Sequence, residues 1–177
     1  VYTGWTITVD PNSPVAPRAQ ADALNCNTEH TYPQSKGAGS GNARSDLHHL
    51  FPVRADVNSS RSNKVFSNIT TTDTYYPGDE DRGDVARILF YMVVMYQELT
   101  LVEDILPNNP LTNYTPNGAY MSVLEYLLAW HFQDEVDYFE QNRNEVIFTA
   151  QNNRNPFIDY PHLVELIWYN HPGIPVS

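Results

Sequence analysis

The chain is poor in cysteine and has no long apolar run. Cys26 is the single cysteine among 177 residues, so no internal disulfide can form and the fold cannot depend on one. The densest apolar run, residues 88–96, is about half the length needed to cross a bilayer. We therefore expect that run to form a buried core helix, and we expect no membrane partner.

Basic residues are also scarce, with 10 Lys and Arg against 21 Asp and Glu and a net charge of −11. Such a total argues against a nucleic-acid partner, but the distribution of charge matters more than the total. Residues 1–35 carry a net charge of −2, residues 36–64 carry +3 and the remainder carries −12. The positive segment begins shortly after Glu29 and His30. Charge alone leaves two interpretations open: a polyanion-binding segment, or a solvated basic loop on an acidic protein.

Hydrophobic residues make up 41% of the chain and aromatic residues 12%, which indicates a folded domain with a core. Alternation of apolar and polar residues predicts an early strand over residues 1–10, followed by a proline-rich loop over 11–17 and a second extended segment over 26–32. Apolar spacing further along the chain predicts helices at 79–99, 121–132, 134–151 and 161–168. The fold class is therefore α+β, with a small strand-containing part packed on a mostly helical core.

Side chains able to do chemistry are concentrated in a short segment that has few apolar residues. They are Glu29, His30, Arg44, Asp46, His48, His49, Arg61 and Asn63. Polar residues on loops beside a rigid scaffold are typical of functional sites. Taken singly, His30 would more often be a structural histidine and Asn63 an ordinary helix-end residue. Neighbours on a regular strand face opposite sides, so Glu29 and His30 can share a site only if their strand ends or distorts there.

Four ordered blocks carry a resemblance to a known family: NTEHTYPQSKG, ARSDLHHLFPVRADVNSSRSN, DRGDVARILFYM and NRNPFID, between residue 26 and about residue 159. They resemble the bacterial endonuclease I family, which belongs to the His-Me finger, or ββα-metal, nucleases. The resemblance implies a ββα-metal motif packed on a mostly helical core. It also implies that residues 1–177 form a single nuclease domain lacking an N-terminal helical segment that family members usually carry.

The resemblance also implies roles for individual residues. His30 matches the general base that takes a proton from water, and Glu29 and Asn63 match the protein ligands of one catalytic metal. An arginine of the family assists the scissile phosphate, and spacing leaves Arg44 and Arg61 as alternatives. One carboxylate and one amide suit a hard cation, so we expect Mg²⁺, with Ca²⁺ or Mn²⁺ as substitutes.

Further residues are expected to support the site or contact the substrate. The predicted substrate contacts are Lys36, Arg44, Arg61, Lys64 and Arg154, although Arg154 could equally hold a turn. Asp46 is expected to cap a short turn. At least one of His48 and His49 is expected to be a buried, hydrogen-bonded histidine supporting the site.

We therefore predict a secreted or periplasmic, monomeric, metal-dependent endonuclease. It would cleave DNA, with RNA as a further candidate substrate, show little sequence preference and leave 5′-phosphates. One alternative is a catalytically inactive DNA- or surface-binding domain with the same fold. Another is a hydrolase of a different substrate with histidine zinc ligands, although the HExxH and CxxC spacings are absent.

Overall fold

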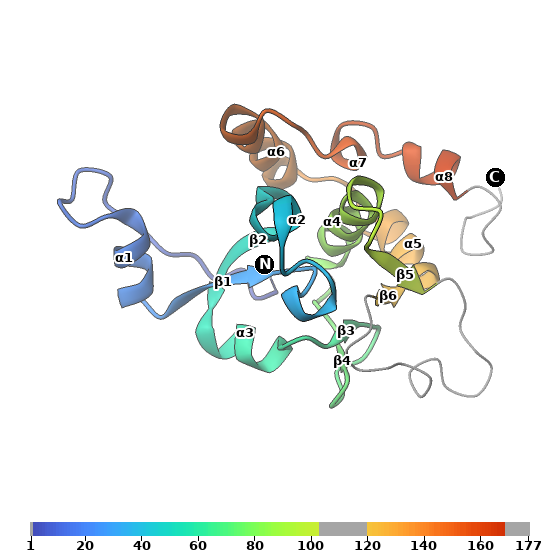
Figure 1. Cartoon of the computed structure of the whole chain (residues 1–177), viewed down its shortest axis with the longest axis horizontal. Helices are drawn as coiled ribbons and strands as arrows, with labels where there is room; N and C mark the ends of the chain where they lie inside the picture. The colour runs from blue at the N-terminus through green and yellow to red at the C-terminus, as the bar shows by residue number, and fades with distance from the viewer. Residues whose placement is uncertain (1, 103–119, 169–177) are drawn as a thin grey trace.

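A computed structural model describes residues 2–102 and 120–168 (Figure 1). The first part of the chain contains short elements: α1 (Pro17–Ala23), β1 (Cys26–His30), η1 (Gln34–Lys36), α2 (Gly41–Ser45), η2 (Leu47–His49), β2 (Leu50–Arg54) and α3 (Ala55–Arg61). The second part is mainly helical: β3 (Val65–Phe66), β4 (Thr74–Tyr75), α4 (Arg82–Met95), β5 (Thr100–Val102), β6 (Tyr120–Val123), α5 (Leu124–Gln133), α6 (Tyr138–Gln151), α7 (Pro156–Asp159) and α8 (Leu163–Ile167). The predicted α+β class is confirmed.

Over the described residues the strands form three separate two-stranded sheets. Strands β1 and β2 are antiparallel, with Glu29 opposite Phe51 and His30 opposite Leu50. The other two pairs, β3 with β4 and β5 with β6, are parallel. Helix α3 begins directly after β2 and contacts both β1 and β2. The β1–β2 pair and α3 therefore form one compact unit beside the helical part (Figure 1).

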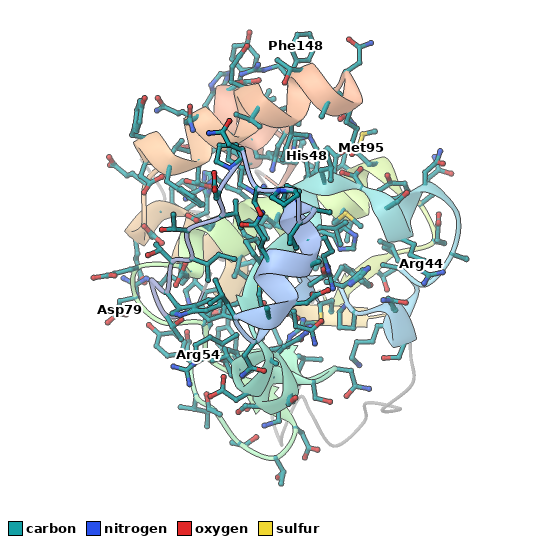
Figure 2. All side chains as sticks on the ribbon, turned by 90° about the vertical axis from the view of Figure 1, so that its left-hand side faces the viewer. Arg44, His48, Arg54, Asp79, Met95 and Phe148 are labelled. Carbon is teal, nitrogen blue, oxygen red and sulfur yellow. The ribbon has the colours of Figure 1, made fainter. Side chains whose placement is uncertain are left out.

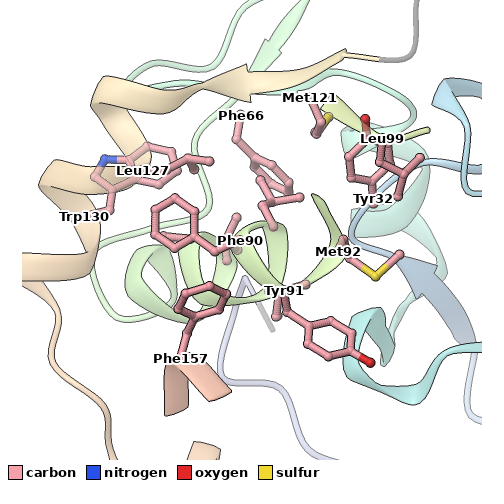
Figure 3. Close-up of a cluster of buried hydrophobic side chains, with 14 of the residues drawn as sticks. Tyr32, Phe66, Phe90, Tyr91, Met92, Leu99, Met121, Leu127, Trp130 and Phe157 are labelled. Carbon is pink, nitrogen blue, oxygen red and sulfur yellow. The ribbon is translucent and has the colours of Figure 1, made fainter. Parts of the chain in front are cut away.

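Helix α4 is the centre of the core, as its apolar sequence predicts. Its residues from Gly83 to Met92 are all buried, and it packs mainly against α5 and also against α7. Aromatic side chains from several elements surround it, including Phe66, Trp130 and Phe157 (Figure 3). Among the described residues no helix is both long and apolar enough to cross a bilayer. The core helix is confirmed, within narrower bounds than the predicted 79–99.

Helix α6 begins with a capping box. The Asp137 side chain accepts a hydrogen bond from the Glu140 N–H at 2.8 Å, and Glu140 Oε2 accepts one from the Asp137 N–H. This start satisfies two backbone donors that would otherwise be unpaired and sets the helix beginning at Tyr138 rather than at residue 134.

Glu140 also belongs to a buried ion-pair cluster, here called the helical cluster, formed by Asp84, Arg87 and Glu140. Arg87 donates from Nε and Nη2 to the two oxygens of Glu140, at 2.6 Å each. Its Nη1 donates to the Asp134 carbonyl oxygen at 2.7 Å, and Nη2 lies 3.4 Å from Asp84. The cluster joins α4 to α6 across the core.

Several predicted elements were wrong. Residues 2–10 form no strand, since none of the described strands pairs with them. The proline-rich loop ends in α1, which Pro17 starts and which was not predicted. Residues 121–123, which were predicted to start a helix, instead belong to strand β6, because β5 provides a pairing partner. Helix α5 begins after them. Helix α8 begins at Leu163, after the predicted start at Pro161.

Candidate active site

Strand β1 ends at His30, which meets the condition under which the neighbouring residues Glu29 and His30 can face one site. Glu29 is buried at the inner side of the strand and His30 is half-buried. Both border a pocket of about 370 Å³. The pocket is also lined by Gln34, Ser35, Asn58, Arg61, Ser62 and Asn63. The structure therefore brings the predicted base and both predicted metal ligands to one pocket.

Asn63 reaches the pocket because α3 stops abruptly. Ser62 has a φ of 53°, in the left-handed region that few non-glycine residues adopt, and its N–H donates to the Asn58 carbonyl at 2.8 Å. The chain therefore turns immediately after the helix. Asn63 then donates from Nδ2 to Ser35 Oγ at 3.2 Å, which leaves the amide oxygen Oδ1 as an acceptor.

Glu29 receives two polar contacts from distant parts of the chain. The Tyr2 hydroxyl donates to Oε1 at 2.7 Å, and Arg61 Nη1 lies 3.1 Å from the same oxygen. Neither contact uses Oε2. Burial raises the pKa of Glu29, while the positive charge of Arg61 and the hydrogen bond from Tyr2 oppose that rise. A carboxylate and an amide oxygen in one pocket fit a hard divalent cation, which takes oxygen ligands and keeps several waters.

The two candidate arginines lie in very different environments. Arg61 is buried; besides contacting Glu29, it donates to the carbonyl oxygens of His30, Ser62 and Thr31. Its guanidinium also lies 4.7 Å from the centre of the Phe66 ring. Arg44 is exposed and lies at the edge of the molecule in Figure 2. Arg61 is thus committed to internal contacts, whereas the Arg44 side chain is accessible to solvent.

The hydrogen bonds of His30 define which ring nitrogen can act as a base. Nε2 lies 3.1 Å from the Arg44 carbonyl oxygen, which can only accept, so Nε2 carries the hydrogen. In the neutral ring Nδ1 then has the free lone pair; the Gln34 amide nitrogen lies at long distances from both ring nitrogens, 3.4 Å from Nδ1 and 3.3 Å from Nε2. Burial lowers the pKa of His30, the hydrogen bond to the Arg44 carbonyl opposes that change, and the charges of Arg44 and Arg61 add to it. The net lowering of the pKa favours the neutral ring.

Behind His30 lies a buried polar layer. The His49 ring packs edge-on against His30 with 5.3 Å between ring centres, and burial lowers the pKa of His49 to about 4. His48 is buried too, and burial also lowers its pKa. Burial of these histidines is confirmed. Asn153 lies near the His48 ring, and the Ala43 and Tyr32 backbones lie near the His49 ring, where their hydrogen bonds oppose the lowering of the two pKa values. Since no ring nitrogen of either histidine meets strict hydrogen-bond geometry among the described residues, the expected hydrogen bond stays a prediction.

Asp46 caps η2 as predicted, accepting a hydrogen bond from the His48 N–H at 2.9 Å. Its carboxylate also accepts from the Tyr91 and Tyr96 hydroxyls and from the Gln151 amide, at 2.6–2.8 Å. Burial would raise the pKa of Asp46, but these donors hold it below its usual value. Asp46 thus anchors the segment whose Arg44 carbonyl orients His30.

The predicted substrate-contacting cations do not gather on one surface. Lys36 is buried, and burial lowers its pKa. Lys64 is half-buried, next to the pocket in sequence. Arg154 lies outside the pocket, where it forms ion pairs with Glu145 at 2.6 Å and Asp159 at 2.7 Å. These pairs favour the alternative in which Arg154 holds a turn.

No group of three or more His, Cys, Asp or Glu side chains within residues 2–102 and 120–168 is arranged to hold a metal. The Glu29 and Asn63 pair is smaller than such a group and contains an amide. A second, larger hollow of about 480 Å³ is bordered by Arg87, His131 and Glu165 among others. None of the predicted site residues lines it.

An α+β chain that places a glutamate, a histidine and an asparagine around one pocket matches the arrangement expected from the sequence blocks. The chain belongs to the endonuclease I family, since the family model described as Endonuclease I matches residues 8–162. It is 42% identical over 161 residues to an extracellular ribonuclease of Bacillus amyloliquefaciens, covering 80% of this chain and 53% of that protein.

A second relative is an extracellular ribonuclease of Bacillus subtilis (strain 168), 40% identical over 158 residues, with 80% of this chain and 54% of that protein covered. The chain thus spans about half the length of the curated relatives it matches. Family membership of the matched part is clear from both kinds of comparison.

Proposed function

We propose that this chain is a secreted, metal-dependent endonuclease that hydrolyses phosphodiester bonds of RNA and DNA with little sequence preference. The observation that carries the proposal is the convergence of Glu29, His30 and Asn63 on one pocket. Both relatives are named extracellular ribonucleases, which supports RNA as a substrate and secretion as the destination. The β1–β2 pair followed by α3 is the arrangement that we propose as the ββα-metal motif.

In the proposed reaction His30 Nδ1 takes the proton from the attacking water. The Arg44 carbonyl oxygen lies 3.1 Å from His30 Nε2 and accepts its hydrogen, so that Nδ1 keeps its lone pair. A neutral imidazole is suited to this step at neutral pH, and burial lowers the pKa of His30, which favours the neutral ring. The exposed Gln34 amide, whose nitrogen lies 3.4 Å from Nδ1 and 3.3 Å from Nε2, must move aside to admit the water.

Glu29 Oε2 and Asn63 Oδ1 would hold the divalent cation, for which we propose Mg²⁺. When bound, the cation supplies positive charge that stabilises the crowded phosphorus of the transition state and the leaving 3′-oxygen. The two protein ligands contribute one negative charge, which leaves positions for phosphate oxygens and water. Products with 5′-phosphates follow, because the 3′-oxygen leaves.

Of the two arginines, we propose Arg44 as the one that contacts the phosphate. Its side chain is exposed, and its own carbonyl orients His30. Among the described residues Arg44 forms no ion pair within 4.0 Å. Arg61 has an exposed side-chain fraction of only 1% and already donates to three carbonyl oxygens. Its role would be to hold Glu29 and the end of β1.

Water as the nucleophile has a consequence for substrate choice. A mechanism that used the ribose 2′-hydroxyl would cleave only RNA and leave a cyclic phosphate, whereas activated water needs no 2′-hydroxyl. The proposed site therefore acts on both sugars, and cleavage of DNA distinguishes the two mechanisms.

The test is digestion of plasmid DNA and of a structured RNA with Mg²⁺, with EDTA and with His30→Ala. Both substrates should be cut by the wild-type chain in Mg²⁺ and spared in EDTA, and His30→Ala should be slower by about 10²–10⁴-fold. Cutting of RNA alone, undiminished by EDTA, would contradict the mechanism. Equal rates for the wild type and His30→Ala would exclude His30 as the base.

A further inference from the structure

We propose that Tyr2 is a positioning residue of the metal site, whose hydroxyl holds Oε1 of Glu29 so that Oε2 is presented to the cation. This inference rests on the proposed function. Tyr2 precedes Glu29 by 27 residues, yet its hydroxyl donates to Glu29 at 2.7 Å in a buried setting. Tyr2 also lies ahead of residues 8–162, which the family model matches.

The N-terminal segment is built to bring Tyr2 to this point. Its ring is buried among aromatic side chains, with ring centres 6.0 Å from Phe66 and 5.3 Å from Tyr75. Tyr2 adopts a φ of 74°, a left-handed conformation that is rare for a large side chain and persists only when surrounding contacts hold it. The packing therefore fixes the hydroxyl against Glu29.

Without the Tyr2 hydroxyl, Arg61 could bind both oxygens of Glu29. A guanidinium facing a carboxylate prefers a bidentate pair in which both oxygens accept hydrogen bonds. Arg87 makes that pair with Glu140, reaching both oxygens at 2.6 Å. Arg61 instead contacts only Oε1 of Glu29, the same oxygen that Tyr2 binds. The hydroxyl of Tyr2 thus opposes rotation of Glu29 into a bidentate pair that would occupy Oε2.

The test is Tyr2→Phe, which removes the hydroxyl and keeps the ring in its aromatic cluster. Mn²⁺ serves as the probe, and the free ion is measured by electron paramagnetic resonance without any substrate. Loss of an outer partner of a ligand should weaken Mn²⁺ binding by about tenfold. The matched control is Tyr75→Phe. Tyr75 packs on Tyr2, but within the described part of the chain it is Tyr2, and not Tyr75, that donates a hydrogen bond to Glu29.

A second readout separates positioning from a merely structural role. If Tyr2 positions the ligand, Tyr2→Phe should require more Mg²⁺ for half-maximal nuclease activity, and saturating Mg²⁺ should restore kcat. A lowered kcat that excess Mg²⁺ does not restore, together with a lower melting temperature, overturns the proposal. So does Mn²⁺ affinity in Tyr2→Phe within about twofold of the wild type, because outer partners of ligands matter more than that.

Failure of the inference and failure of the proposed function give different results. If the wild type binds Mn²⁺ and Glu29→Gln does not, the metal site stands whatever Tyr2→Phe does. If Glu29→Gln binds Mn²⁺ as tightly as the wild type, the metal assignment is wrong and the role of Tyr2 falls with it.

Discussion

Two buried arginines hold glutamates in this molecule, one at the pocket and one in the helical cluster. Arg61 and Arg87 are both almost completely buried, with exposed fractions of 1% and 0%. Arg87 reaches both oxygens of Glu140, and the Asp137 N–H donates to one of them as well. Arg61 reaches only Oε1 of Glu29, which it shares with Tyr2.

The difference shows why a buried ion pair does not by itself indicate a functional site. The two oxygens of Glu140 are used by partners that join α4 to α6, so this carboxylate stabilises the fold. Glu29 lies at a pocket and has an oxygen that neither Arg61 nor Tyr2 uses. Both glutamates form an ion pair with a buried arginine. What distinguishes a candidate metal ligand from a structural residue is a carboxylate oxygen that the arginine does not occupy.

Among changes to the two buried pairs, the largest effect should come from Glu29→Gln, which keeps the shape of the side chain and removes its charge. Loss of charge on the proposed ligand should slow cleavage of RNA and DNA by about 10²–10³-fold at neutral pH. Initial rates at saturating Mg²⁺, normalised to folded protein, measure the effect. A rate within about threefold of the wild type would be too small for loss of such a charge and would remove Glu29 from the site.

The corresponding change in the helical cluster, Glu140→Gln, should act on stability instead. Removing one partner of a buried pair leaves Arg87 poorly compensated, and we expect the free energy of unfolding to fall by about 3–5 kcal/mol. Urea unfolding measures this loss. The rate per folded molecule should stay unchanged, and a rate loss as large as that of Glu29→Gln would erase the proposed contrast between the two pairs.

A pH-dependent difference should appear at His131, beside the helical cluster. Burial, with Arg87 nearby, lowers the pKa of His131 to about 4 from 6.5. The unfolded chain then binds more protons than the folded chain between these values, so this residue makes stability fall as the pH falls from 6.5 to 4. In His131→Phe the decrease in the free energy of unfolding over this pH range should be smaller by up to about 3 kcal/mol.

Thermal or urea unfolding of the wild type and His131→Phe at several pH values between 4 and 6.5 tests this expectation. The nuclease rate at neutral pH should be the same in both proteins. Parallel stability curves for the two would mean that His131 is protonated equally in the folded and unfolded chains.

The smallest effect should distinguish the exposed Arg44 near the pocket from the half-buried Arg154, which lies outside it. Arg44→Ala should slow cleavage by about tenfold through loss of one phosphate contact, and it should reduce the salt dependence of binding. Arg154→Ala, which breaks ion pairs with Glu145 and Asp159, should leave the rate unchanged. Rates over a range of salt concentrations measure both. The reverse order of effects would reassign the phosphate contact to Arg154.

Features encoded by neighbouring residues were predictable from the sequence. The apolar run of α4, the presence of a strand within residues 26–32 and the cap formed by Asp46 each depend on a few adjacent positions, although the strand ends at His30, two residues earlier than predicted. Four ordered sequence blocks carried the family resemblance, which in turn singled out Glu29, His30 and Asn63. The resemblance, together with these local signals, was enough to name three residues that the structure brings to one pocket.

Contacts between distant segments were not predictable in the same way. The hydroxyls that bind Asp46 come from residues 45 and 50 positions later, and Gln151 is 105 positions later. Tyr2 was assigned to a strand by its alternating pattern, yet it packs alone into the core because no described strand pairs with its segment. Similarly, spacing could not choose between Arg44 and Arg61, because their difference lies in burial.

The most direct test of the central claim is a crystal structure of the chain soaked in Mn²⁺, with the ion located by its anomalous scattering. The account predicts one peak in the pocket, bound by Glu29 Oε2 and Asn63 Oδ1, with the His30 ring close by. A peak bound by His48 and His49, or by Asp84 and Glu140 with the pocket empty, would contradict it.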